Sequence, residues 1–143
     1  MEKHFLKFIF SGLFVLILAG IFYVIYRPES LIVLQLFGDT RVLDPMFLFF
    51  GTGSLPSFLH TLAFCLLTTA FVKITRNNVI FVSLFWFLIN ASYELFSASQ
   101  YAEQVGMLFY GDVYDVISSF FGAFAYLAFT FRFCAELNPI IKE

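Results

Sequence analysis

The chain has 143 residues, of which 61% are hydrophobic and only 13% are charged. Soluble domains average roughly 45–50% and about 25% for the same classes. A domain this small buries only a limited fraction of its surface, so the composition argues against a water-soluble fold. The net charge of −2 does not indicate a partner class, and the sequence has no basic patch that would suggest a nucleic-acid partner.

The first apolar stretch covers residues 8–26 and follows Lys3, His4 and Lys7. A positive start before an apolar run is also typical of a secretory signal peptide. This run of 19 uncharged residues is longer than a signal core, and Tyr26 and Arg27 do not form a small-residue cleavage pattern. We therefore expect a retained membrane helix.

Three further apolar stretches cover residues 55–72, 79–98 and 116–133. Each approaches the roughly 20 residues that a helix needs to cross a bilayer. Because backbone amides in lipid need internal partners, helices are the expected structure. The sequence predicts an all-α integral membrane protein, a single domain over residues 1–143 that forms a four-transmembrane-helix bundle.

The connections differ in length and polarity. An inner loop is expected at 73–78, and outer loops at 27–54 and 99–115. The apolar segments 31–37 and 46–50 of the first outer loop are too short to span, and we expect them to lie in the interface or fold back over the bundle. A glycine-containing segment at 51–54 then breaks the chain before Pro56, a residue favoured in a helix's first turn.

The basic residues predict the orientation. If the helices alternate in direction, six of the eight fall on one side, and only Arg27 and Arg41 fall on the other. The positive-inside bias then places both termini and the 73–78 loop in the cytoplasm, which is an N-in/C-in arrangement.

Glu94 lies late in the third stretch, about 22 Å along a helix that starts at Val79. With Ser83, Asn90 and Ser97 it forms a polar stripe at helical spacing. Such a stripe faces away from lipid, and interhelical hydrogen bonding alone would explain Ser83 and Asn90. An ionisable group at this depth is also a typical functional residue.

His60 lies four residues after Pro56, near the outer end of the second stretch. Alternating helices place it at the same depth as Glu94. A histidine here either makes a local hydrogen bond at headgroup level or acts as the partner of a carboxylate.

Asp112 and Asp115 introduce the fourth stretch. An aspartate at a helix start caps free amides and suits the helix dipole, and one of the two is expected to do so. Asp115, Ser119, Gly122 and Tyr126 fall on one face. Ser118 and Gly122 form a small-residue pair that favours close packing against a neighbouring helix.

These positions bring His60, Glu94, Asp112 and Asp115 to one level near the outer surface. A histidine with paired carboxylates is able to perform acid–base chemistry, bind a cation or relay protons. No nucleophile motif, phosphate loop or close-spaced metal signature accompanies them. The sequence predicts neither a metal nor a cofactor, and Cys65 is expected to be a small buried hydrophobe, as is the second cysteine, Cys134.

Three segments within residues 55–130 resemble the VanZ-like family of small bacterial membrane proteins. They are His60 after Pro56, Glu94 late in the next helix, and the run DVYDVISSFFGA at 112–123. The resemblance makes His60, Glu94, Asp115 and Gly122 the motif positions. The chain departs from the family pattern at Ser97, where glutamine is usual, at Ser119, where asparagine is usual, and by lacking an arginine before the aspartates.

The resemblance implies a protein of the bacterial inner membrane, in a family associated with glycopeptide resistance and the cell envelope. We expect a polar pocket at the outer leaflet that binds or acts on an envelope lipid or lipid-linked precursor. The expected catalytic residues are Glu94, His60 and Asp115, and the expected substrate-binding residues are Asp112, Asn90, Ser97 and Ser119. Two alternatives remain: a non-catalytic subunit or scaffold that docks a larger partner, and an ion- or proton-coupled transporter protomer that works as a homo-oligomer.

Overall fold

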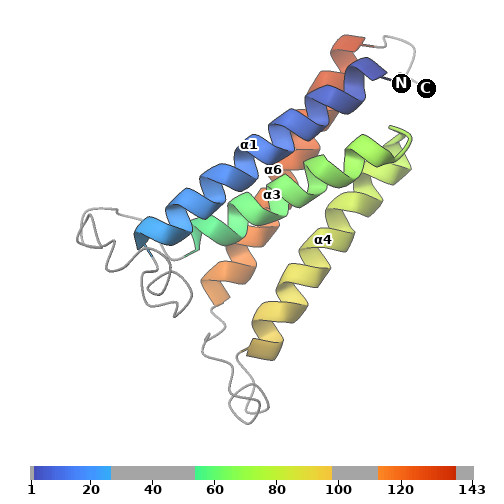
Figure 1. Cartoon of the computed structure of the whole chain (residues 1–143). Coiled ribbons are helices and arrows are strands. Elements are labelled where there is room, and N and C mark those ends of the chain that lie inside the picture. Colours follow the sequence, from blue (N-terminus) through green and yellow to red (C-terminus); the bar gives the residue numbers. More distant parts are fainter. Residues whose placement is uncertain (1, 27–53, 98–112, 138–143) are drawn as a thin grey trace.

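The computed structural model describes residues 2–26, 54–97 and 113–137, and these are almost entirely helical. The helices are α1 (Glu2–Tyr26), α3 (Leu55–Phe71), α4 (Arg76–Ser97) and α6 (Val113–Leu137). Successive helices run in opposite directions, so the start of α1, the end of α6 and the α3–α4 turn lie at one end of the bundle (Figure 1). The predicted all-α class with four helices is confirmed for the described residues.

Three of these helices are long and apolar enough to cross a membrane. The apolar spans are His4–Phe22 in α1, Arg76–Phe96 in α4 and Val113–Arg132 in α6. The remaining helix, α3, is equally apolar in character but has only 17 residues, which correspond to about 26 Å of helix. The described residues therefore include three full-length candidate spans and one shorter apolar helix.

The short helix α3 is the centre of the bundle. It packs most extensively against α1 and next against α6, while α4 packs more on α6 than on α3. The core cluster draws side chains from all four helices: Phe8, Cys65, Leu66, Val79, Val82 and Tyr126. Cys65 is fully buried and reduced, as the sequence predicts, whereas the side chain of Cys134 lies outside the described residues.

Two glycines, one in α1 and one in α6, allow these helices to approach α3 closely. A Cβ on Gly122 of α6 would clash with the carbonyl oxygen of Phe58 and lie 3.2 Å from the Cβ of Thr61. A Cβ on Gly12 of α1 would lie 2.7 Å from the Cγ of Leu67. The close packing predicted for Gly122 is confirmed, and its neighbour is α3.

The ends of the helices differ from the apolar stretches. The helix expected at 79–98 begins at Arg76, because Thr75 caps it: the Asn78 backbone N–H donates to the Thr75 hydroxyl at 3.2 Å. The Asn78 side chain also donates to the Lys73 carbonyl at 2.8 Å. The predicted 73–78 loop is therefore too long. Apolar composition marks the stretch suited to lipid, whereas backbone hydrogen bonding continues into polar residues.

α1 and α6 also extend beyond their apolar stretches, whereas α3 does not. α3 agrees with the predicted 55–72 to within one residue and carries Pro56 in its first turn. α1 starts six residues before the predicted 8–26 run, and α6 extends beyond 116–133 at both ends. Almost all of the predicted outer loops, 27–54 and 99–115, lies outside the described residues.

Candidate functional site

One face of α6 carries buried polar residues from its first turn to its middle. Asp115 is 1% exposed, and Ser119 and Tyr126 are fully buried on the same face as Gly122. This face meets α3, because Gly122 lies against Phe58. The face predicted from helical spacing is thus confirmed as a packing face. Asp115 lies in the first turn of α6, where a carboxylate suits the positive end of the helix dipole.

Further along this face a hydroxyl pair joins α6 to α3. The oxygens of Tyr126 and Thr69 lie 2.6 Å apart, and the Thr69 hydroxyl is also 2.7 Å from the Cys65 carbonyl. A carbonyl only accepts, so Thr69 donates to it and Tyr126 donates to Thr69. This network fixes the half of the α3–α6 contact that lies nearer the α3–α4 turn.

The helices α3, α4 and α6 meet at Thr61. The Asn90 amide donates to the Thr61 hydroxyl and to the Trp86 carbonyl, both at 3.0 Å. Thr61 in turn donates to the Ser57 carbonyl at 2.9 Å, and its Cβ borders Gly122. Asn90 is therefore engaged in interhelical packing, the role that its position in the polar stripe predicts. Ser83 has the same role, donating to the Ala123 carbonyl at 3.2 Å.

His60 begins a stack of rings between α3 and α4. It is half-buried and lies nearly parallel to Phe64, with ring centroids 6.1 Å apart. Phe64 stacks in turn on Trp86 at 4.7 Å, and the Trp86 indole N–H donates to the Thr68 hydroxyl at 2.8 Å. This stack holds His60 on the side of α3 that faces α4.

Glu94 is half-buried near the end of α4. Its neighbours Tyr93 and Leu95 are 46% and 68% exposed, so this last turn presents apolar surface on both sides of the carboxylate. Ser97 ends α4, and its side chain lies outside the described residues. Asp112 also lies outside them, immediately before α6 begins.

The register of the helices shows which of these residues lie at the same height along the bundle axis, referred to below as one level. On the antiparallel pair α4 and α6, Ser83 bonds to Ala123, and the Phe87 and Phe120 rings meet at 5.7 Å. Extending that register places Asp115 opposite the turn between Asn90 and Glu94. Asn90 bonds to Thr61, the residue after His60. His60, Asn90, Glu94 and Asp115 therefore lie within about one to two helical turns of one level.

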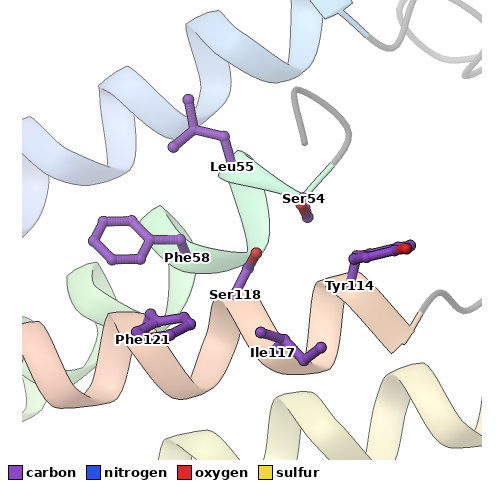
Figure 2. Close-up of a pocket in the computed structure, with 7 residues that line it drawn as sticks. All are labelled: Ser54, Leu55, Phe58, Tyr114, Ile117, Ser118 and Phe121. Atoms are coloured by element: carbon purple, nitrogen blue, oxygen red, sulfur yellow. The ribbon is translucent and has the colours of Figure 1, made fainter. Parts of the chain in front are cut away.

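An apolar groove opens beside this level, between the first turns of α3 and α6 (Figure 2). It encloses about 560 Å³ and is lined by Ser54, Leu55, Phe58, Tyr114, Ile117, Ser118 and Phe121. Figure 2 shows the Phe58 and Phe121 rings at one end of the groove and Ser54 and Tyr114 at the other. Asp115 is adjacent in sequence to Tyr114. The groove thus combines an apolar floor with hydroxyl groups and neighbours a buried carboxyl group.

Ser119 has a different environment from Ser83, although both are buried. Its hydroxyl has no hydrogen-bond partner within the part of the chain that the structure describes. We expect Ser119→Ala to leave stability unchanged or to raise it slightly, because no bond is lost. Ser83→Ala, which removes the bond to Ala123, should destabilise by roughly 0.5–1.5 kcal/mol. Thermal unfolding in detergent measures both, and an equal loss for the two variants would contradict the assignment.

Comparison with models of known protein families, with curated proteins and with solved structures finds no match to this chain. Among the described residues, no group of three or more His, Cys, Asp and Glu side chains is arranged to hold a metal ion.

Sequence reasoning missed most residues that line the groove. Phe58, Ile117 and Phe121 occur in a chain where phenylalanine is abundant, so nothing in their type distinguishes them from residues that face lipid. The sequence does contain a signal for the polar face of α3 that packs on α4 and α6. Small and hydroxyl-bearing residues repeat there every four positions, which is the spacing of one helix face: Ser57, Thr61, Cys65 and Thr69.

Proposed function

We propose that this chain is a VanZ-like protein of the bacterial inner membrane, and that its groove binds or acts on an envelope lipid or lipid-linked precursor. In this proposal all four helices span the bilayer with both termini in the cytoplasm. The alternation of the helices in Figure 1 supports an even number of crossings. The short helix α3 falls at the lower end of the roughly 17–25 residues found for spanning helices.

The observation that carries the proposal is the groove between α3 and α6. Its lining is mainly aromatic and aliphatic, with the Ser54, Tyr114 and Ser118 hydroxyls distributed along it. An apolar cleft with a few polar groups is typical of a ligand site. Its place at the end of the bundle opposite the termini corresponds to the outer leaflet in the proposed orientation.

The neighbouring polar residues supply the chemistry. Glu94 is the proposed acid–base or binding carboxylate, His60 its partner, and Asp115 an orienting group held by the packing of α6 on α3. Of the remaining predicted binding residues, Ser119 offers a buried hydroxyl, and Asn90 positions α4 through Thr61. Burial strengthens electrostatic interactions among these side chains, because water is excluded from around them.

The test is to fill the groove. Ser118→Phe adds a ring to a half-buried lining position, and we expect it to reduce by at least tenfold the envelope lipid that co-purifies from bacterial membranes in mild detergent. Native mass spectrometry measures the bound lipid. Ser92→Phe is the matched control, because Ser92 is exposed on α4 and outside the groove lining.

Retention of the same lipid by well-folded Ser118→Phe would contradict the proposal. Circular dichroism and gel filtration establish that the variant is folded. If a stoichiometric protein partner co-purifies in place of lipid, a scaffold role replaces the ligand site.

A further inference from the structure

A second groove lies at the opposite end of the bundle, between α1 and α6. It encloses about 330 Å³ and is lined by Leu6, Lys7, Phe8, Phe10, Ser11 and Phe129. Two of the rings that line it are exposed on the surface of the bundle: Phe10 is 68% exposed and Phe129 is 48% exposed. This groove is apolar along most of its length and has an ammonium group among its lining residues.

Lys7 of α1 and Arg132 of α6 have the same order relative to the rings of the groove: Lys7 lines the groove, and Arg132 lies about one turn beyond its lining residue Phe129. On α1, Lys7 precedes Phe10 by three residues, and on α6, Arg132 follows Phe129 by three. Residues three apart lie on the same side of a helix. Because α1 and α6 run in opposite directions, each cation lies about one turn farther from the bundle centre than its ring (Figure 1). Both walls thus change from apolar to cationic in the same direction.

The surrounding charge has the same sign. Among the described residues, acidic positions at this end of the bundle are Glu2 and Glu136, and the basic ones are more numerous: Lys3, Lys7, Lys73, Arg76 and Arg132. Basic residues at the membrane surface attract anionic headgroups, and basic pockets between membrane helices are typical sites for them.

We propose that this groove binds one anionic phospholipid of the leaflet at the basic end, with an acyl chain along Phe10 and Phe129 and the phosphate near Lys7 and Arg132. The inference rests on the membrane insertion in the proposed function, but it concerns a different site from the α3–α6 groove. Charge complementarity selects an anionic lipid over a zwitterionic one, since the apolar lining alone accepts either.

The experiment uses the full chain in phosphatidylcholine vesicles that contain graded fractions of phosphatidylglycerol. After mild extraction, native mass spectrometry counts the phosphatidylglycerol retained per protein. We expect a preference for phosphatidylglycerol in the unmodified chain, and a loss on the order of fivefold for each of Lys7→Gln and Arg132→Gln. Arg132→Lys, which keeps the charge, should retain most of the binding.

The matched control is the double variant Lys73→Gln/Arg76→Gln. It removes two charges from the same end of the bundle, but Lys73 lies between α3 and α4 and Arg76 begins α4, so neither is on the two helices that form the groove, and retention should change less than twofold. The double variant Lys7→Gln/Arg132→Gln is compared with this control. If both lose the same amount of bound phosphatidylglycerol, the site is overturned, because general surface charge would then explain the binding. Equal retention of phosphatidylglycerol and phosphatidylcholine by the unmodified chain would also overturn it.

Two readouts on the same vesicles separate this inference from the proposed function. Resistance to alkaline extraction reports membrane insertion, and protease digestion of a C-terminal tag reports orientation. A chain that is not inserted overturns the proposed function and this inference together. An inserted chain with no lipid preference overturns this inference alone.

Discussion

Gly122→Ala is expected to destabilise the bundle by about 1–3 kcal/mol, the range typical of overpacking in a well-packed core. The added methyl group would clash with the Phe58 carbonyl oxygen and press on Thr61. A backbone atom within a helix cannot move aside as the end of a side chain does. α6 must therefore shift away from α3, which also strains the hydroxyl pair of Thr69 and Tyr126.

Two other glycines make this test specific. Gly20 has nothing within 4 Å of an added Cβ, so Gly20→Ala should be neutral or stabilise by up to about 1 kcal/mol through helix propensity. Gly12→Ala should fall between the two, because its nearest neighbours are side-chain atoms of Leu67. Thermal unfolding in one detergent gives the order, and equal stability of the Gly122 and Gly20 variants would contradict the close α3–α6 contact.

Glu94→Gln is expected to abolish the proposed activity while leaving the fold intact. The substitution keeps the size of the side chain and removes its negative charge. Loss of a charge-assisted hydrogen bond to a ligand corresponds to roughly 1.5–3 kcal/mol, or about a 10- to 150-fold loss of affinity. Two measurements check it: the lipid-linked precursor retained by the purified protein, and glycopeptide susceptibility of cells that express it.

Glu136→Gln is the matched control for this variant. It makes the same chemical change in the last turn of α6, at the end of the bundle opposite the α3–α6 groove, and should leave both measurements unchanged. A Glu94→Gln variant with full retention and full activity would remove Glu94 from the site. Proton flux in liposomes that depends on Glu94 would instead favour the transporter alternative.

Sequence reasoning determined the helices themselves. Each apolar stretch became a helix, because a continuous apolar run leaves the backbone no polar partner except itself. Helical periodicity in the sequence also identified the buried face of α6, which carries Asp115, Ser119 and Tyr126. The same periodicity in α4 assigned Ser83 and Asn90 to interhelical hydrogen bonds. Patterns within one helix were sufficient for these assignments, since they depend on local geometry.

Only the tertiary structure decided which helices meet and what opens between them. That Gly122 lies on Phe58, that Asn90 bonds to Thr61, and that His60 joins a ring stack ending on Trp86 all depend on side chains from separate helices. The two grooves have the same origin, because each lies between helices far apart in sequence. In a chain with 23 phenylalanines, residue type alone does not separate a ring that faces lipid from one that lines a cavity; helix packing makes that distinction.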